Sequence, residues 1–277
     1  MHWHTSRYVI DLSRPRVMGI VNITPDSFSD GGRHGDTRSA MAHCEQLLRE
    51  GADILDLGGE SSRPGAEALP LEEELARVLP VLREAVRLGV PVSIDTYKIE
   101  VMRAALDAGA DIVNDIYALR SPGAEAVVAG HPRCGVCLMH MQGEPKSMQA
   151  APHYDDVVTE VRDFLQARAA ALRERGVAGE RIVLDPGYGF GKSVGHNFEL
   201  LRRQRELLGA GYPLLAGWSR KSWLGAVTGR AVNERLAASV AAALAAVERG
   251  ARIVRVHDVA ATVDALKVWA HAGLPWS

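Results

Sequence analysis

The chain of 277 residues has few cysteines, almost no net charge and no long apolar segment. Its three cysteines do not resemble the disulfide framework of a secreted protein. The 32 basic and 34 acidic residues leave a net charge of −2, and proteins that bind nucleic acid usually carry a basic excess instead. No apolar run approaches the ~18 residues of a membrane-spanning helix, and Met1–His4 lacks the pattern of a signal peptide. We therefore expect a soluble, cytoplasmic, globular protein that binds neither nucleic acid nor membrane.

A short phrase recurs along the chain and indicates its organisation. Gly-Ala-Asp-Ile-Leu-Asp-Leu at 51–57 returns as Gly-Ala-Asp-Ile-Val-Asn-Asp at 109–115 and, more loosely, as Gly-Ala-Arg-Ile-Val-Arg-Val at 250–256. Each copy follows a stretch rich in Ala, Leu and Arg with helical periodicity. A glycine that ends a helix and leads into a short strand explains the phrase. Strands that are apolar on both faces are typical of parallel sheets covered by helices.

Further strands and helices fit between the copies. The predicted strands are 16–21, 52–57, 91–94, 111–113, 135–139, 181–184, 213–216 and 252–256. The predicted helices are 37–50, 71–88, 99–107, 155–175, 197–208, 233–248 and 259–271, with a longer loop at 142–152. The strands recur about every 34 residues, which suits an eight-stranded barrel of about 250 residues.

We therefore predict an α/β fold, a TIM (β/α)8 barrel in a single domain over residues 1–277, with a short N-terminal β extension at 8–12. The competing architecture is a doubly wound open sheet. It is less favoured because no glycine-rich fingerprint follows the first strand.

Polar residues follow nearly every predicted strand, where the active site of such a barrel forms. These segments are 22–32, 58–65, 95–96, 114–115, 139–143, 185–193, 218–222 and 255–258. A single one is explained by a helix cap or a turn. Taken together they bring a set of cations to face Asp95 and Asp185, namely Arg63, Arg220, Lys221, Arg255 and His257. Phe28 and Phe190 also lie in these loops, where each either anchors its loop or offers a ring to a flat ligand.

Three patterns resemble other kinds of site. Residues 187–193 end in Gly-Lys-Ser, but Pro186 stands where a P-loop needs its first glycine. Cys134 and Cys137 have the spacing of a redox pair, yet residues three apart in a strand point to opposite faces, so two buried thiols are expected. The histidines of Met1–His4 could hold a metal, although a disordered terminus is favoured.

Seven segments, in order, resemble the motifs of bacterial dihydropteroate synthases. The first is Val-Met-Gly-Ile-Val-Asn-Ile-Thr-Pro-Asp-Ser-Phe-Ser-Asp-Gly-Gly at 17–32, and the second is Asp-Leu-Gly-Gly-Glu-Ser-Ser-Arg-Pro-Gly-Ala at 56–66. The others are 93–98, 138–143, 184–192, 219–222 and 255–258. The resemblance covers 17–258 and implies a TIM barrel, which the strand spacing indicates independently.

The resemblance also implies a reaction and its residues. It implies condensation of 7,8-dihydropterin-6-ylmethyl diphosphate with 4-aminobenzoate, which gives 7,8-dihydropteroate and diphosphate in folate biosynthesis. The implied pterin contacts are Asp95, Asn114, Met139, Asp185, Phe190, Lys221 and Arg255. The implied diphosphate contacts are Asn22, Ser62, Arg63, Arg255, Val256 and His257, with Asn22 also binding Mg²⁺. The implied 4-aminobenzoate contacts are Phe28, Ser62, Pro64, Phe190, Lys221 and Ser222. The implied catalytic residues are Asp95, Asp185, Lys221, Arg63, Arg255 and His257.

The chemistry of these residues agrees with that reaction. Diphosphate leaves readily only when Mg²⁺ and cationic side chains match its charge. As the C–O bond breaks, positive charge spreads into the pterin, where two carboxylates would stabilise it. We therefore expect a dissociative substitution without a covalent enzyme intermediate, with the first two loops closing as a lid. Ser62 and Trp218 depart from the residues expected of the family and bear on the shape of the aminobenzoate pocket and on sulfonamide sensitivity.

Two other functions compete with this interpretation. A pterin-binding methyltransferase domain would share the barrel but would not need Arg63, Arg255 and His257. A catalytically silent pterin-binding paralogue would have damaged first or second loops, and here both are complete. The resemblance further implies a homodimer. The small-residue helix at 237–246 would pack either on a partner or on its own barrel.

Overall fold

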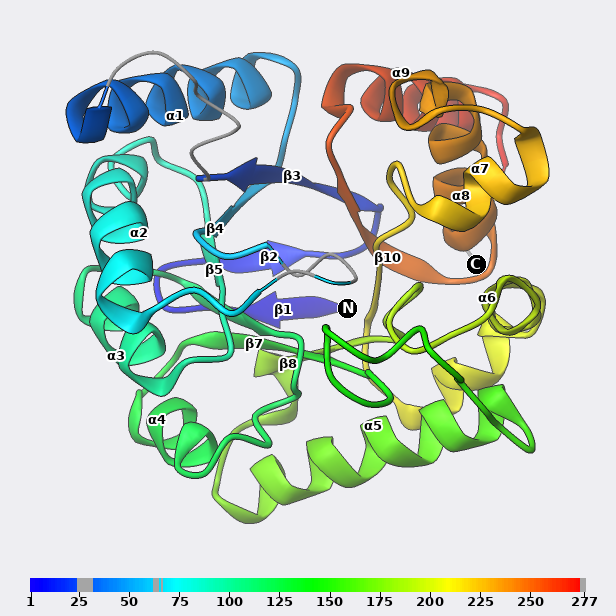
Figure 1. The fold of residues 1–277 in the computed structure, drawn as a ribbon, viewed down its shortest axis with the longest axis horizontal. Coiled ribbons are helices and arrows are strands. Elements are labelled where there is room, and N and C mark those ends of the chain that lie inside the picture. The colour runs from blue at the N-terminus through cyan, green and yellow to red at the C-terminus, as the bar shows by residue number, and fades with distance from the viewer. Residues whose placement is uncertain (24–31, 62–64, 66, 275–277) are drawn as a thin grey trace.

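Eight parallel strands close into a barrel, with helices around its outside (Figure 1). This computed structural model describes residues 1–23, 32–61, 65 and 67–274, with the backbone alone for 32–36. Around the barrel, the strands of this described part are β10 (Ala251–Val256), β3 (Arg16–Asn22), β4 (Ile54–Gly58), β5 (Val92–Asp95), β6 (Ile112–Asp115), β7 (Gly135–Met139), β8 (Ile182–Asp185) and β9 (Leu214–Ala216). The predicted fold class is confirmed, and each strand begins and ends within two residues of its prediction.

The helices follow the strands in alternation. They are α1 (Gly32–Arg49), α2 (Leu71–Ala85), α3 (Ile99–Asp107), α4 (Ala124–Gly130), α5 (Val157–Glu174), α6 (Val194–Arg202), α7 (Ser222–Thr228), α8 (Leu236–Glu248) and α9 (Val259–His271). Three 3₁₀ segments also occur in the described residues, namely η2 (Gly179–Arg181), η3 (Gln204–Ala210) and η4 (Val232–Glu234).

All seven predicted helices are present, but two short helices were not predicted. Helices α3 and α9 have the predicted bounds, whereas the helix predicted at 197–208 is α6 followed by η3. The sequence missed α4 and α7, which have seven residues each. Two turns of helix are too short to display a clear apolar period, which is why they gave no signal.

The barrel interior has an apolar layer that an N-terminal hairpin closes. One apolar side chain from each of seven strands forms this layer: Met18, Ile54, Ile112, Cys137, Val183, Leu215 and Ile253. The antiparallel hairpin of β1 (His2–His4) and β2 (Val9–Asp11) packs on it through Trp3, Ile10 and Leu12. Trp3 is fully buried, and its Nε1 donates to the carbonyl of Arg181 at 3.0 Å.

The expectation of a disordered terminus at Met1–His4 was therefore wrong. His2 and His4 are exposed while Trp3 between them is buried, an alternation typical of a strand. A strand of three residues is too short to recognise before its partner and the barrel end that it covers are known. The described residues contain no group of three or more metal-ligating side chains.

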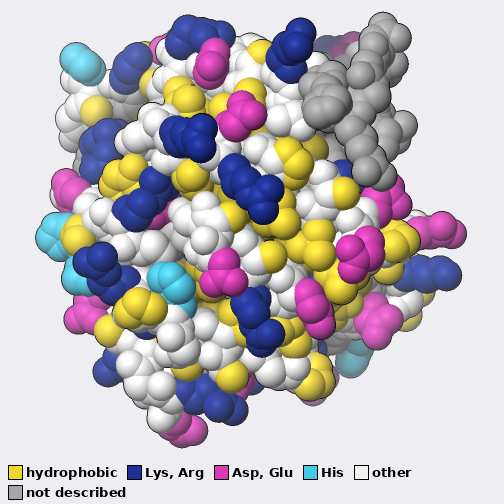
Figure 2. Space-filling model, turned by 90° about the vertical axis from the view of Figure 1, so that its left-hand side faces the viewer, with side chains coloured by type: hydrophobic (Ala, Val, Ile, Leu, Met, Phe, Trp, Pro, Cys, Tyr) yellow, Lys and Arg dark blue, Asp and Glu magenta, His cyan; other side chains and the backbone are white. Residues whose placement is uncertain are grey.

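Two further predictions concern the cysteines and the surface. Cys137 lies inside the barrel and Cys134 between barrel and helices, so both thiols are buried and face opposite ways, as predicted. Basic and acidic side chains are interspersed over α1–α4 (Figure 2), in keeping with the near-zero net charge. Among the described helices, none is both long and apolar enough to cross a membrane.

Candidate functional site

Polar side chains form a second layer inside the barrel, toward the carboxyl ends of the strands. In four strands a residue of the apolar layer is followed two positions later by a polar one, because side chains alternate between the two faces. The pairs are Ile54 and Asp56, Ile112 and Asn114, Val183 and Asp185, and Ile253 and Arg255. The barrel therefore presents charged groups at the end where TIM-barrel enzymes hold their active sites.

Strand register brings the predicted site residues side by side. Asp95 at the end of β5 pairs with Asn114 of β6, and through Gly58 of β4 the same row reaches Asn22 at the end of β3. Met139 pairs with Asp185 across β7 and β8. Within the first row alone, Asn22 and Asn114 are 92 residues apart in the sequence.

Arg255 is the centre of this polar layer. Its Nε lies 2.6 Å from Oδ2 of Asp56, and its Nη2 lies 2.6 Å from Oδ2 of Asp95. Asn114 donates from Nδ2 to the same Asp56 oxygen at 3.2 Å. Asp56 is fully buried, and its Oδ1 has no hydrogen-bond partner. The guanidinium therefore compensates two carboxylates in the barrel interior and fixes their positions.

A second cluster surrounds Asp185 at the β8 end. The Gly187 N–H donates to Oδ1 of Asp185 at 2.7 Å. Lys221 donates from Nζ to the carbonyl of Tyr188 at 2.7 Å and lies 4.3 Å from the ring centroid of Phe190. The loop after β8 therefore carries or orients an acid, a cation and an aromatic ring.

An apolar cluster lies beside these charged groups. It contains Met139 and Phe190, both predicted to flank a flat ligand. The other members are Ile116, Met141, Met148, Tyr97 and Tyr117. Apolar side chains next to convergent polar groups are typical of small-molecule sites.

Burial changes the ionisation of three site residues. Burial raises the pKa of Asp95 to about 7, although Arg255 opposes the rise. It also raises the pKa of Asp185, which the N–H of Gly187 and the charge of Lys221 oppose. The pKa of Lys221 falls to about 7 because the side chain is buried, and Asp185 opposes the fall. The charge of the site thus changes near neutral pH, where perturbed groups are common in active sites.

We expect a pH dependence of pterin binding that follows Asp95. Protonation of Asp95 as the pH falls through about 7 removes a carboxylate acceptor for the N–H groups of a pterin, while Lys221, whose pKa is also about 7, takes up its proton over the same range and stays a donor. The affinity for 6-hydroxymethylpterin should fall by up to about tenfold per pH unit below pH 7. Calorimetric titration between about pH 5.5 and pH 8 measures this. The Asp95→Asn variant should bind more weakly with a flatter profile, and an equally steep profile in that variant contradicts the assignment.

The loops after β9 and β10 are tied together. Oγ of Ser219 accepts from the N–H of His257 at 3.1 Å and lies 3.0 Å from its Nδ1. Arg220 pairs with Asp258 at 2.6 Å and adopts a left-handed backbone with φ of 58°. A non-glycine residue in this conformation costs free energy, and such strain clusters at functional sites. These contacts fix Lys221 relative to His257.

Six further residues were predicted to belong to the site. Phe28, Ser62, Arg63 and Pro64 lie outside the described residues. Ser222 is exposed at the start of α7, and Val256 is buried at the end of β10, ahead of α9.

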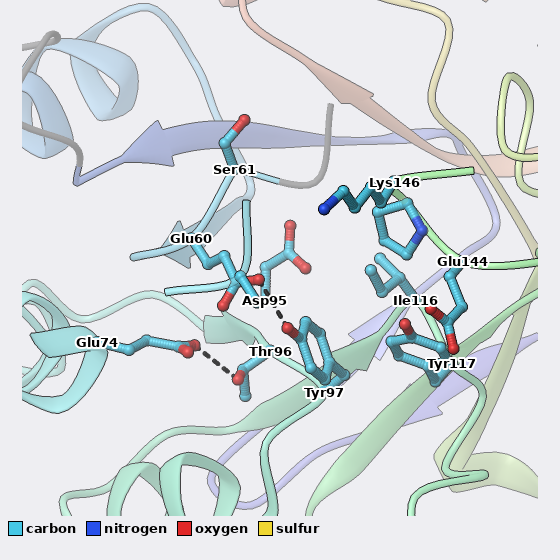
Figure 3. A pocket seen from close by; sticks show the side chains of 12 residues that line it. Glu60, Ser61, Glu74, Asp95, Thr96, Tyr97, Ile116, Tyr117, Glu144 and Lys146 are labelled. Atoms are coloured by element: carbon cyan, nitrogen blue, oxygen red, sulfur yellow. Dashed lines mark hydrogen bonds between the residues drawn. The ribbon is translucent and has the colours of Figure 1, made fainter. Parts of the chain in front are cut away.

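A cavity of ≈ 170 Å³ borders the polar layer on the side of β5 and β6 (Figure 3). Asp95 is the one predicted site residue, among those the structure describes, that lines it. Next to Asp95 in the cavity lining, Tyr97 donates to Glu60 at 2.7 Å, and Lys98 pairs with Glu60 and Glu74. These contacts hold Glu60 just before the predicted residues Ser62 and Arg63.

Comparison with known proteins identifies the family. The model for pterin binding enzymes matches residues 18–257. The dihydropteroate synthase of Neisseria meningitidis serogroup B is 55% identical over 278 residues, which cover 98% of each chain. This chain belongs to the dihydropteroate synthase family.

Two solved structures of the dihydropteroate synthase family closely match the fold. The enzyme of Xanthomonas albilineans with 4-aminobenzoic acid has a TM-score of 0.90 at 54% identity and covers 96% of both chains. The enzyme of Burkholderia cenocepacia complexed with 7,8-dihydropteroate has a TM-score of 0.89 at 54% identity, covering 98% of this chain and 96% of that one. The resemblance seen in the sequence is thereby confirmed.

The sequence analysis did not predict Asp56 as a site residue, although Asp56 is the first residue of the second motif. Its signal was an acid within an otherwise apolar strand, two positions after Ile54. A charge at a buried position needs a partner, and Arg255 supplies it. Trp218 is buried against Tyr188 at a ring distance of 4.4 Å.

Proposed function

We propose that this protein catalyses the dihydropteroate synthase reaction. 7,8-Dihydropterin-6-ylmethyl diphosphate and 4-aminobenzoate combine, the new C–N bond replaces the C–O bond, diphosphate leaves, and the product is 7,8-dihydropteroate. The observation that carries the proposal is the polar layer in which Arg255 joins Asp56 and Asp95 beside Asp185 and Lys221. Family membership over nearly the whole chain supports it.

The pterin would lie across the carboxyl end of the barrel. A pterin edge presents N–H donors and ring acceptors in a fixed pattern, which suits carboxylates together with an amide and an ammonium group. Asp95 and Asp185 would accept from it, and Asn114 and Lys221 would donate to it. Met139 and Phe190 would contact its faces, and the aliphatic stem of Arg255 would stack on the ring while its guanidinium stays paired with Asp56 and Asp95.

The substitution would be dissociative. Loss of diphosphate leaves positive charge on the methylene carbon and the pterin ring, and the fixed carboxylates of Asp95 and Asp185 stabilise that charge. The neutral amine of 4-aminobenzoate then attacks and gives up its proton, which requires no strong base. No side chain forms a bond to the pterin, so trapping of a pterinyl-enzyme adduct would contradict this mechanism.

The leaving group would be held at the ends of β3 and β10. Diphosphate would contact Asn22, Ser62, Arg63, Arg255, Val256 and His257. Mg²⁺ would bind the diphosphate with Asn22 and neutralise its charge. Asn22 fits this role because it ends β3 and stays partly exposed, so its amide oxygen can reach a hydrated ion. The 4-aminobenzoate would contact Phe28, Ser62, Pro64, Phe190, Lys221 and Ser222.

Product formation tests the proposal. Diphosphate release from the dihydropterin diphosphate is measured with Mg²⁺, in the presence and absence of 4-aminobenzoate. We expect turnover that requires 4-aminobenzoate and yields dihydropteroate. Pterin binding without product would instead indicate a silent paralogue, and methyl transfer from a folate would indicate a pterin-binding methyltransferase.

We also propose a cytoplasmic homodimer. Helices α7, α8 and α9 lie side by side and expose Val227, Leu236 and Val268 at 61%, 46% and 69%. Helix α8 buries Ala242, Ala243 and Ala246 against its own barrel, which leaves its other face for a partner. Exposed apolar side chains on neighbouring helices favour self-association. Sedimentation equilibrium checks the dimer.

A further inference from the structure

Backbone carbonyl oxygens surround the side-chain nitrogen of Lys192. Lys192 lies in the loop between β8 and α6 and is 1% exposed. Its Nζ lies 3.0 Å from the carbonyl oxygen of Gly187, 3.1 Å from that of Phe190 and 3.4 Å from that of His140. It also lies 2.8 Å from Nδ1 of His140. Within the described residues no acidic side chain forms an ion pair with it, so its partners are all neutral acceptors.

The imidazole of His140 is suited to accept this bond. Burial lowers the pKa of His140, and the nearby charge of Lys192 lowers it further, so the ring is neutral and Nδ1 can accept. The ring packs edge-on against Phe164 at 4.9 Å, which holds its orientation. Burial also lowers the pKa of Lys192, while Asp185 opposes the fall. Three carbonyl oxygens and Nδ1 of His140 surround Nζ, so each of the three donors of a protonated amine has an acceptor.

The backbone of the loop explains why carbonyls converge here. Gly187, Gly189 and Gly191 all have positive φ, at 65°, 90° and 64°. A Cβ on Gly187 would lie 1.9 Å from the carbonyl oxygen of His140, so the loop is folded tightly against the end of β7. A P-loop gathers N–H groups around an anion, whereas this loop gathers carbonyl oxygens. The Gly-Lys-Ser sequence at 191–193 therefore serves a different purpose.

The same loop controls three residues of the proposed site. Gly187 accepts from Lys192 through its carbonyl and donates to Asp185 through its N–H. Phe190 accepts from Lys192 through its carbonyl while its ring lies next to the ammonium of Lys221. Lys192 therefore contacts Asp185 through Gly187 and Lys221 through Phe190. These are residues that would hold the pterin.

We propose that Lys192 is a positioning residue for pterin binding, acting through the carbonyls of Gly187 and Phe190. This inference rests on the proposed function. Without the side-chain nitrogen, the buried carbonyl oxygens would have no hydrogen-bond donor. The loop would then shift so that water could reach them. Misplacement of binding groups by about 1 Å lowers activity by about 100-fold.

Arg181 provides a matched control. It is 7% exposed and donates to the carbonyls of Cys134 and Val128 at 2.7 and 2.9 Å, again without an ion pair among the described residues. It lies at the opposite end of the barrel, where its own carbonyl accepts from Trp3. Arg181→Met thus removes a buried cation from backbone carbonyls far from the site.

The first experiment compares ligand affinity in the two variants. The dissociation constant for 6-hydroxymethylpterin is measured by calorimetry, with urea unfolding in parallel. We expect Lys192→Met to raise it by about 10- to 100-fold, and Arg181→Met to leave it within about twofold while still lowering the urea midpoint. Wild-type affinity in Lys192→Met, or an equal loss in Arg181→Met, would overturn the inference.

A rescue experiment covers the case in which Lys192→Met fails to fold. Lys192→Ala removes the atoms of propylamine, so added propylammonium should restore pterin affinity about tenfold, whereas propanol should not. Equal effects of the two, or none from either, would overturn the inference. The affinity assay needs no turnover. Wild type that binds pterin without product would contradict the proposed function alone, and product formation with unaltered Lys192→Met affinity would contradict this inference alone.

Discussion

Asp185→Asn is expected to lower kcat/KM for dihydropteroate formation by about 1000-fold. The substitution keeps the shape but removes a buried negative charge that would accept from the pterin and stabilise its developing cation. A charge-assisted hydrogen bond contributes about 1.5–3 kcal/mol, and a preorganised group that stabilises charge in a transition state contributes about 100- to 1000-fold. Steady-state kinetics with both substrates measures the total loss in kcat/KM. Calorimetry with a pterin measures the part that comes from weaker pterin binding.

Asp115→Asn is the matched control for this loss. Asp115 is also a fully buried carboxylate at the end of a strand, but its oxygens accept from the N–H groups of Tyr117 and Leu119 at 2.8 and 2.7 Å. It supports the turn in which Leu119 has a positive φ of 57°. We expect about 1–3 kcal/mol lower stability and kcat/KM within about threefold of wild type. Similar kinetic losses in both variants would show that any buried carboxylate at this end suffices, against the role given to Asp185.

Arg255→Met is expected to abolish measurable turnover and to lower the free energy of unfolding by about 3–5 kcal/mol. The guanidinium is shared by Asp56 and Asp95, each 2.6 Å away. Its removal leaves two carboxylates close together inside the barrel without a cation, and unpaired buried charges are costly. Urea unfolding at neutral pH measures the stability, and dihydropteroate formation measures the activity.

A second substitution separates the two effects. Asp56→Asn in the Arg255→Met background removes one uncompensated charge, so it should recover part of the lost stability but none of the activity. Arg220→Met is the control, because its pair with Asp258 is 44% and 20% exposed and should contribute less than about 1 kcal/mol. If Arg255→Met unfolds at the wild-type urea concentration, the stabilising role assigned to this ion pair is wrong.

Most of the barrel could be predicted because its signals are local. The apolar runs at β4, β6 and β10 follow a helix that ends at glycine, so strand, helix and connection appear together within about 34 residues of sequence. Asp95 and Asp185 were predictable for the same reason, since each is the first polar residue after an apolar strand. Helices α4 and α7 and strand β1 escaped prediction because short elements show too few periods.

The sequence by itself determined the fold class, the family and which residues lie at the carboxyl ends of the strands, because periodicity and motifs depend on neighbours along the chain. The tertiary structure decided how those residues pair. Arg255 reaches Asp56 across 199 positions of sequence only because β10 closes the barrel against β3. Trp3 covers one end of the barrel, and Lys192 donates to several backbone carbonyls, for a similar reason. Their partners lie on strands and loops that only folding brings together.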